Sequence, residues 1–391
     1  MFCSDVFLDV LKKNFIEPTA SNACYHFPTY STNKDDILIT GKSESDTGPF
    51  VCAYEEPLSI ELLENYENKI LELAILNTHN KESRGFYRPL KFLINSEHSQ
   101  LKNDWIKKHQ YIDWYLFYHG FAALFWYQRF QYFPKNEAKF THVFINFNHL
   151  ILEKRSYRLN FLAHLLAKNL DQFGLISMAL LEDQWKKEIF NPNSLLSYDA
   201  KKLILNQFKN LNKRFVLDCD DVHGALSADV NRELNNTAFF QIVNETVFYD
   251  QKLHLTEKIF KPIVCRQPFI LLGAPFNLRY LKSYGFRTFD HWIDESYDEE
   301  IDPDLRIQKI VVEIEKLTKL SLSQLHDMQQ EMQEVLDYNF DYFYSDFKKK
   351  IVNEMIDNFE KTLNIFNFDT SDRFRINYTL DINQIRHKFL L

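Results

Sequence analysis

Residues 256–275 read TEKIFKPIVCRQPFILLGAP, a segment that joins a helix start to a buried strand. Thr256 is a suitable N-cap for the apolar residues of 260–265, which recur at helical spacing. The run 268–272 has the wholly apolar character of a parallel strand that is covered on both faces. Residues 238–243 form another apolar, strand-like segment upstream. This order of strands and helices predicts an α/β fold with parallel sheets.

Polar and charged side chains follow these predicted strands. Asn244, Glu245 and Thr246 come directly after the first strand, and Glu257 and Lys258 open the helix. Ligands of open α/β sheets bind at the carboxyl ends of the strands, so the sequence predicts a binding site there. The amides and dipole of the helix start favour a phosphate, to which Lys258 adds a positive charge. The Glu257 carboxylate can accept both hydroxyls of a ribose.

An ordinary helix start is the alternative interpretation of this segment. Glu257 and Lys258 would then be a first-turn acid and a solvated amine, an arrangement that stabilises a helix by only about 0.3–1 kcal/mol. Arg155 and Arg158, considered by themselves, would likewise be surface charges at the beginning of another helix.

Several of these segments resemble one family when they are taken together. Thr-Glu-Lys-Ile, the strand that ends in Gly-Ala-Pro and the preceding Asn-Glu-Thr element resemble the donor-binding half of fucosyltransferase-type and exostosin-like GT-B glycosyltransferases. The predicted strand 142–148, followed by Arg155, Arg158 and a helix, is similar to the unit that opens the same domain. The resemblance extends over roughly residues 140–295.

The resemblance implies a GDP- or UDP-linked sugar as donor substrate, with no cofactor required and no metal. Glu257 would bind the nucleotide ribose, Lys258 and Arg158 the diphosphate, and residues 244–246 the sugar side. The family reads Glu-Asn-Thr or Glu-Asn-Ser at this last element, whereas this chain reads Asn-Glu-Thr, so the sugar stays open. The predicted donor site comprises Arg155, Arg158, Asn244, Glu245, Thr246, Thr256, Glu257, Lys258 and Gly273.

Two Rossmann-like domains facing a cleft, with long C-terminal helices, are the predicted architecture. The chain has 391 residues, enough for about two or three domains. A polar Pro-Lys-Asn-Glu linker divides an α/β acceptor-side domain, residues 1–139, from the donor-binding domain, residues 140–300. Residues 301–391 carry apolar residues at helical spacing over 305–336 and 343–363, which predicts two long amphipathic helices. The resemblance to GT-B proteins implies that these helices brace both domains.

Inverting glycosyl transfer needs a general base beside the acceptor hydroxyl. Predicted strands over 90–95 and 112–118 flank a helix as in a βαβ unit, and Glu97, His98 and His119 follow their ends. These three residues are the predicted catalytic candidates, because the ends of parallel strands share one rim. Glu97 ranks first, since carboxylates commonly serve in glycosyl chemistry.

Two other classes of function stay open. Asp218 and Asp220 form an Asp-x-Asp element of the kind with which metal-dependent GT-A glycosyltransferases hold a divalent ion. The third possibility is a non-catalytic binding or structural protein that keeps a degenerate transferase fold. Retaining GT-B enzymes often carry a Glu eight residues before the ribose-binding one, but Tyr249 stands there in this chain, which favours inversion.

The composition of the chain restricts the cellular compartment and the classes of binding partner that are expected. The net charge of −8 argues against a nucleic-acid binder of the usual basic kind, and the acceptor can be a glycan, a protein or a modified nucleic acid. The five cysteines are scattered without a metal-binding spacing, which predicts free thiols in a reducing cytoplasm. No uncharged apolar run approaches the roughly 18 residues of a membrane span, so a soluble, cytoplasmic protein is expected.

Overall fold

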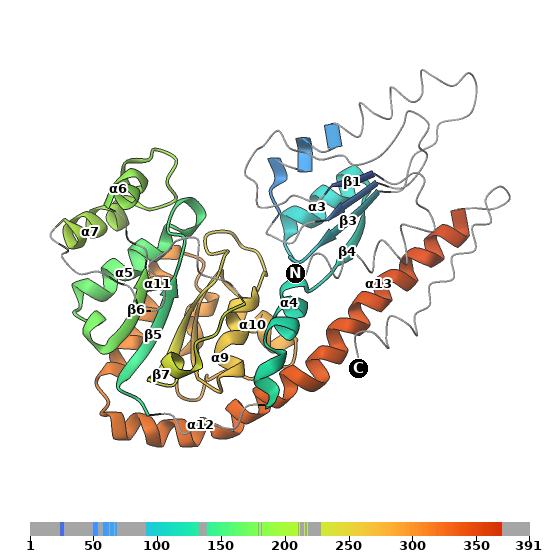
Figure 1. The fold of residues 1–391 in the computed structure, drawn as a ribbon. Helices are drawn as coiled ribbons and strands as arrows, with labels where there is room; N and C mark the ends of the chain where they lie inside the picture. Colours follow the sequence, from blue (N-terminus) through green and yellow to red (C-terminus); the bar gives the residue numbers. More distant parts are fainter. Residues whose placement is uncertain are drawn as a thin grey trace. The chain divides into compact units, whose positions relative to one another are not determined.

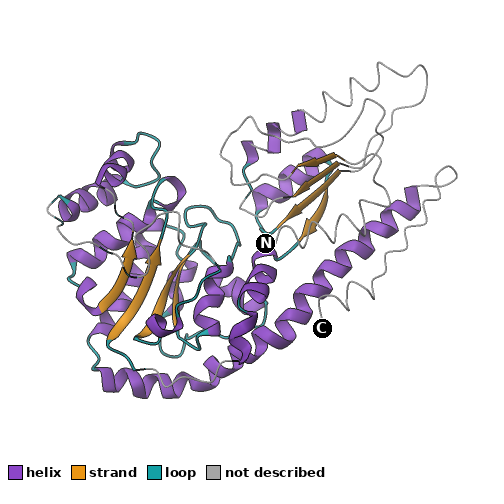
Figure 2. Ribbon diagram, viewed as in Figure 1, coloured by secondary structure: helices purple, strands orange, loops and turns teal. Residues whose placement is uncertain are grey.

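The structure of the chain is a computed structural model, and each of its two compact units contains a parallel sheet with helices (Figure 1, Figure 2). The α/β class with parallel sheets is therefore confirmed. The structure describes residues 24–26, 50–53, 58–61, 63–65, 67–68, 91–132, 139–178, 180, 182–209, 211, 215, 217 and 228–369.

The two units divide the chain as follows. Met1–Ala122 and Lys348–Leu391 belong to the first unit, and Ala123–Phe347 forms the second. The chain thus passes from one unit to the other twice. The predicted domain boundary between residues 139 and 140 falls inside the second unit of this division. The predicted C-terminal segment, residues 301–391, is divided between the two units.

The first unit has a four-stranded parallel sheet with the order β1-β2-β3-β4. The pair β3 and β4 is joined by helix α3 and runs in register from Phe92 opposite Ile112 to Asn95 opposite Tyr115. This is the predicted βαβ unit. The bounds are β1 Cys24–His26, β2 Phe50–Ala53, β3 Lys91–Asn95, α3 Gln100–His109 and β4 Ile112–Tyr115.

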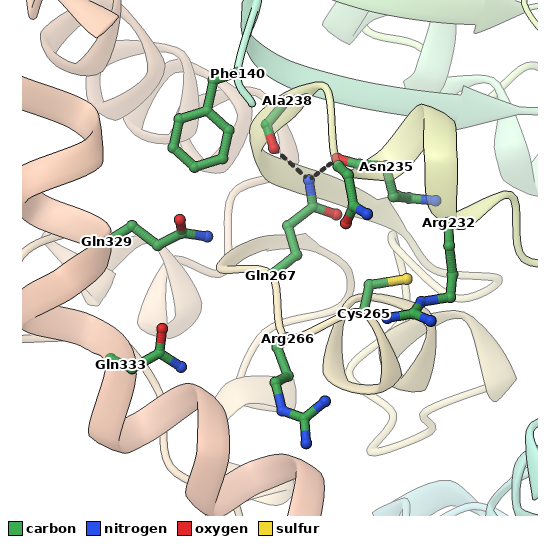
Figure 3. Close-up of a pocket in the computed structure, with 10 residues that line it drawn as sticks. Phe140, Arg232, Asn235, Ala238, Cys265, Arg266, Gln267, Gln329 and Gln333 are labelled. Atoms are coloured by element: carbon green, nitrogen blue, oxygen red, sulfur yellow. Dashed lines mark hydrogen bonds between the residues drawn. The ribbon is translucent and has the colours of Figure 1, made fainter. Parts of the chain in front are cut away.

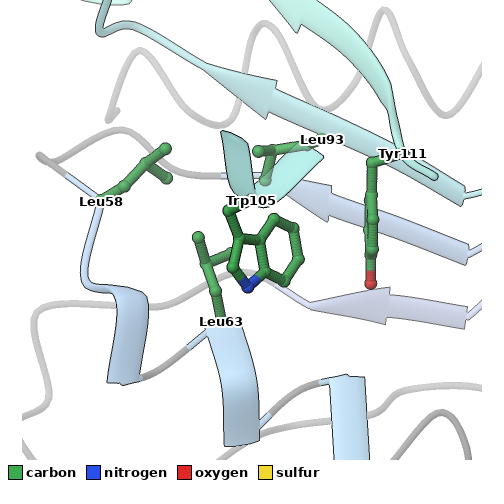
Figure 4. Close-up of a cluster of buried hydrophobic side chains, with 5 residues drawn as sticks. All are labelled: Leu58, Leu63, Leu93, Trp105 and Tyr111. Atoms are coloured by element: carbon green, nitrogen blue, oxygen red, sulfur yellow. The ribbon is translucent and has the colours of Figure 1, made fainter. Parts of the chain in front are cut away.

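A small apolar core holds α3 against this sheet. Leu58, Leu63, Leu93, Trp105 and Tyr111 form one buried cluster (Figure 4). The helix begins at its N-cap Ser99, whose hydroxyl accepts a hydrogen bond from the backbone amide of the third helical residue. Helix α13, Lys348–Asp369, packs on β4 within the same unit.

The strand that was expected over 112–118 is shorter in the structure. It ends at Tyr115, and helix α4, Tyr118–Trp126, follows almost at once. The aromatic residues of this stretch fit the spacing of a strand and that of a helix. The next residues, FAALFW, are apolar without interruption, and a helix can bury more of these six side chains than a strand can. His119 therefore lies in a helix and not at a strand end.

The second unit is built on a four-stranded parallel sheet with the order β6-β5-β7-β8. The strands predicted over 238–243, 142–148 and 268–272 are confirmed, each within one residue at its ends. The central strand β7 is buried along its whole length, as a parallel strand with both faces covered should be. The bounds are β5 His142–Asn148, β6 Gly174–Met178, β7 Ala238–Asn244 and β8 Phe269–Leu272.

Helices cover this sheet. Helix α11 packs on α5 and β8, whereas α12 packs on β5, β7 and α9. The helices are α5 Tyr157–Ala167, α6 Glu182–Phe190, α7 Tyr198–Phe208, α8 Arg232–Asn235, α9 Phe260–Val264, α10 Asn277–Ser283, α11 Pro303–Thr318 and α12 Leu322–Tyr342. Short 3-10 segments are η3 Gln128–Tyr132, η4 Glu153–Arg155, η5 Asp171–Phe173, η6 Glu257–Ile259 and η7 Glu295–Glu299, and η8 Phe343–Phe347 is a π-helix.

The C-terminal helical segment differs from the prediction in one respect. A single helix was expected over 305–336, but α11 and α12 are separate. Ser321 is the N-cap of α12 and forms a reciprocal capping box with Gln324, which favours a new helix start at this point. The long C-terminal helices themselves are confirmed, and none in the described part of the chain is long and apolar enough to cross a membrane.

Gly174 allows β6 to lie beside β5, and its replacement should destabilise the second unit. A Cβ atom at Gly174 would lie 2.2 Å from the ring of Phe144, which is fully buried. We expect Gly174→Ala to lower the free energy of unfolding by about 2–3 kcal/mol, since a packed core cannot take the extra methyl group. Thermal unfolding measures this as a shift of roughly 5–10 °C.

Gly273→Ala is the matched control for that experiment. Its added Cβ would lie no closer than 3.4 Å to any neighbour, which is ordinary van der Waals contact, so little change in melting temperature is expected. Equal shifts for Gly174→Ala and Gly273→Ala would contradict the packing argument.

Candidate functional site

Most residues of the predicted donor site meet at the carboxyl edge of the second sheet. Asn244 ends β7, with Glu245 and Thr246 directly after it, and Gly273 follows the last residue of the neighbouring strand β8. Gly273 lies against the side chain of Glu245, since a Cβ built on it would be 3.4 Å from that of Glu245. The sequence therefore predicted correctly that these segments are neighbours.

Three buried asparagines form a hydrogen-bonded chain across this edge. Asn146 donates its amide nitrogen to the backbone carbonyl of Ile242 at 3.0 Å, which leaves its oxygen as an acceptor. Asn148 Nδ2 donates to that oxygen at 2.6 Å, and Asn244 Nδ2 donates to Asn148 Oδ1 at 2.6 Å. Because the first partner is a carbonyl, which can only accept, the orientation of all three amides is fixed.

This chain of amides ends in a free acceptor. Asn244 is 3% exposed, and its Oδ1 has no hydrogen-bond partner among the described residues. A buried oxygen of this kind needs a donor, such as a ligand hydroxyl. Sequence reasoning missed Asn146 and Asn148, although two asparagines on one face of an apolar strand are a signal of a buried polar network.

Glu245 is the fully buried carboxylate of the site. Thr256 donates its hydroxyl to Glu245 Oε2 at 2.6 Å and its backbone amide to both carboxylate oxygens at 3.2 Å. Burial raises the pKa of Glu245, and the charge of Lys258 and the hydrogen bonds from Thr256 partly oppose this effect. Glu245 thus fastens the end of β7 to the start of the next helix.

Lys258 is the cation that this arrangement holds at the surface of the site. Its Nζ lies 3.1 Å from Thr256 Oγ1, 3.4 Å from Thr246 Oγ1 and 3.1 Å from Glu257 Oε1. Its side chain is 32% exposed, whereas Glu257 is 3% exposed. The contacts fix the position of the ammonium group, and the side chain as a whole stays partly exposed. Thr256 is the N-cap of the segment, as the sequence indicated.

The two arginines of the predicted donor site have different environments. Arg158 is 3% exposed and donates to the backbone carbonyls of Leu150 at 2.8 Å and of Asn244 and Glu245 at 3.3 Å. It ties the loop after β5 to the end of β7. Arg155 is partly exposed, and its side chain has no partner among the residues that the structure describes. Of the two, Arg155 is therefore the more accessible to an anion.

The loop that leads from β7 to Lys258 is anchored from several sides. Phe248 stacks on Tyr157 with ring centroids 4.1 Å apart, and the guanidinium of Arg306 lies 4.2 Å from the centre of the Phe248 ring. Asn277, at the start of α10, accepts from the amide of His254 at 3.0 Å and donates to the carbonyl of Lys252. The site is consequently preorganised and does not depend on a freely moving loop.

Glu97, the first catalytic candidate, is engaged on both carboxylate oxygens. Oε2 accepts from the amide of Leu58 at 2.8 Å, and Oε1 accepts from the hydroxyl of Ser99 at 2.8 Å. The residue is 2% exposed. In this structure Glu97 organises the start of α3.

A second polar cluster lies beside it at the same end of the first sheet. Lys102 is 1% exposed, and its Nζ donates to Asp113 Oδ2 at 3.0 Å. Asn95 bridges the pair, since its amide nitrogen donates to Asp113 Oδ1 at 2.7 Å and its oxygen accepts from Lys102 Nζ at 3.4 Å. These contacts satisfy a buried ammonium group that would otherwise be costly.

His98 and His119, the other catalytic candidates, do not share one environment. His98 is half-buried and stacks on Tyr115 with ring centroids 4.0 Å apart. Burial and the nearby charge of Lys102 lower the pKa of His98 to about 4, although Asp113 opposes this, so the imidazole is neutral at pH 7. His119 is 3% exposed inside α4, with its ring edge-on to Tyr118.

The depressed pKa of His98 predicts how stability depends on pH. An unfolded histidine titrates near pH 6.5, but the folded one stays neutral down to about pH 4. The unfolded chain therefore binds more protons between these values, and the free energy of unfolding should fall as the pH drops through this window, by up to about 3 kcal/mol. We expect His98→Phe, which keeps the stacking on Tyr115, to remove this part of the decrease.

Urea unfolding at about pH 7 and about pH 4.5 measures the effect as a difference between the two proteins. Subtracting the loss of stability of one protein from that of the other cancels the contributions of the other titrating groups. If His98→Phe and the parent chain lose the same stability on acidification, the assignment is contradicted.

Among the described residues, no group of three or more His, Cys, Asp or Glu side chains could hold a metal ion. Asp218 and Asp220, the residues of the metal-dependent alternative, lie outside the described residues. Comparisons with protein-family models, with curated proteins and with solved structures found no match. The site must therefore be interpreted from its own chemistry.

Proposed function

We propose that the chain is a GT-B-like glycosyltransferase that binds a nucleoside-diphosphate sugar at the carboxyl edge of the second sheet. The observation that carries this proposal is the position of Lys258. Its side chain is about one-third exposed, and its ammonium group is held by two threonine hydroxyls and Glu257. A cation that is fixed before the ligand arrives needs no reorganisation to neutralise the diphosphate.

Recognition of the sugar and ribose follows from the acceptors around Lys258. Asn244 Oδ1 needs a hydrogen-bond donor, and hydroxyl groups of a sugar supply one. Glu257 would accept the ribose hydroxyls beside the diphosphate. Arg155 would add a second positive charge to the phosphates, while Arg158 keeps the loops in place through its carbonyl contacts.

Transfer would proceed by inversion and without a metal. The acceptor hydroxyl oxygen forms a bond to the anomeric carbon, the bond from that carbon to the diphosphate oxygen breaks, and the acceptor proton passes to a general base. Among Glu97, His98 and His119 we favour His98, because both oxygens of Glu97 are already engaged and His119 is buried. Lys258 would stabilise the negative charge on the leaving diphosphate.

A thermal-shift screen with nucleoside diphosphates tests this function. A ligand present at about 100 times its dissociation constant stabilises the folded state by about 2.7 kcal/mol, which raises the melting temperature by several degrees. We expect GDP or UDP to do so in the presence of a chelator. If neither nucleotide shifts the melting temperature, with or without a divalent ion, the donor site is refuted and a non-catalytic role is favoured. A shift that requires the ion would favour the Asp218 and Asp220 alternative.

A further inference from the structure

A cavity lies in the second unit, at the amino ends of the strands and thus at the edge opposite the proposed donor site. It has a volume of about 40 Å³ and lies between residues that precede or begin β5, β7 and β8 and the side chains of Gln329 and Gln333 on α12 (Figure 3). This volume corresponds to roughly three water positions. Only a few non-hydrogen atoms fit inside.

Gln267 is one of the residues that line this cavity. The residue is 4% exposed, and its Nε2 donates to the backbone carbonyls of Asn235 at 2.9 Å and of Ala238 at 2.8 Å, as the dashed lines in Figure 3 show. Both partners are pure acceptors, so the amide cannot be reversed. Its Oε1 is left without a hydrogen-bond partner.

Asn235 repeats the same arrangement. It is 3% exposed, its Nδ2 donates to the carbonyl of Asn231 at 2.8 Å, and its Oδ1 has no partner. The cavity therefore has two buried oxygens whose orientation is dictated by the backbone. Leaving such an acceptor unsatisfied is costly, and a ligand with two N–H groups would recover this free energy.

The charges around the cavity restrict the ligand further. Arg232 and Arg266 are also lining residues, and the guanidinium of Arg266 is paired with Asp337 at 3.1 Å. A cationic ligand would be repelled. An anion would place its oxygens against those of Gln267 and Asn235 and could not satisfy them. The remaining class is a neutral group that carries both donors and an acceptor.

We propose that this cavity binds the carboxamide group of a small neutral ligand. The amide NH₂ donates to Gln267 Oε1 and Asn235 Oδ1, and the amide oxygen accepts from Gln333 Nε2, which is buried and lacks a partner among the described residues. The carbon, oxygen and nitrogen of a carboxamide match the size of the cavity. This site is independent of the proposed glycosyl transfer.

Ligand-detected nuclear magnetic resonance with the full chain tests the proposal. Propionamide is compared with propionate and propylammonium, which have similar size but opposite charges, and nicotinamide serves as an amide on an aromatic carrier. We expect saturation transfer to at least one amide and none to the two ions. The amide that binds shows whether the carboxamide group of the ligand is attached to an aliphatic or to an aromatic group. Binding of neither amide, or equal signals from the ions, would overturn the proposal and leave a cavity that holds only water.

Variants on α12 test whether the amide binds in this cavity. Gln333→Leu removes the donor and should weaken amide binding by about tenfold, whereas Gln330→Leu, on the exposed side of the same helix, should leave it unchanged. Gln333→Glu is a second variant that keeps the size, in case the first one fails to fold. If a folded Gln333 variant binds the amide as tightly as the parent chain does, the proposal is wrong.

Discussion

Lys258→Met is expected to slow nucleotide release from the donor sugar by about 100- to 1000-fold, the effect of losing a single preorganised hydrogen-bond donor in other active sites. The methionine keeps the length of the side chain but cannot neutralise the diphosphate as it leaves. Three oxygens hold the ammonium group of Lys258 in place. Glu257→Gln should weaken donor binding, because the carboxylate of Glu257 is proposed to accept the ribose hydroxyls.

Lys261→Met is the matched control for this prediction. Lys261 lies three residues further along the same helical segment, and its Nζ donates to the carbonyl of Asp229 at 2.8 Å. Its replacement should leave the rate within about twofold. The assay measures the nucleoside diphosphate released from GDP- and UDP-sugars. A Lys258→Met protein that is folded and as active as the parent chain would contradict the proposal that Lys258 neutralises the leaving diphosphate.

Arg158→Met should cause the largest loss of stability, about 3 kcal/mol or more. The buried guanidinium donates to three backbone carbonyls, which belong to Leu150, Asn244 and Glu245. Methionine fills much of the space but leaves these carbonyls without their donors and without water. The loop after β5 would then lose its attachment to the end of β7, so nucleotide binding should weaken as well.

Arg155→Met separates the structural effect from the binding effect. Arg155 is partly exposed and has no side-chain partner in the described part of the chain, so the free energy of unfolding should change by no more than about 0.5 kcal/mol. Urea unfolding followed by circular dichroism compares the two variants. Comparable stabilities for Arg155→Met and Arg158→Met would contradict the role assigned to Arg158.

The sequence was a good guide to the strands that build the proposed donor site. The runs over 238–243 and 268–272 are apolar throughout, and in a parallel sheet that pattern has few alternatives. Because parallel strands end at one edge, the meeting of Asn244 and Gly273 followed directly. The stretch 112–118 was ambiguous, since aromatic residues at mixed spacing fit a strand and a helix equally well.

The environments of individual side chains could not be predicted in the same way. Glu245 and Glu257 are both loop-side carboxylates in the sequence, yet both are buried, and Glu245 accepts a hydrogen bond from Thr256, eleven residues away. That contact depends on the path of the intervening loop, which Arg306 and Asn277 fix from distant parts of the chain. The burial of Arg158 has a similar cause, because its carbonyl partners come together only in the folded unit.

Isothermal titration calorimetry with GDP and UDP tests the central claim most directly. The parent chain should release or absorb heat on binding one of the two nucleotides with a stoichiometry of one, in the presence of a chelator. The same titration of Lys258→Met should show binding at least about tenfold weaker, with Lys261→Met unchanged. If the parent chain binds neither nucleotide, or if Lys258→Met binds as the parent chain does, the proposed donor site is contradicted.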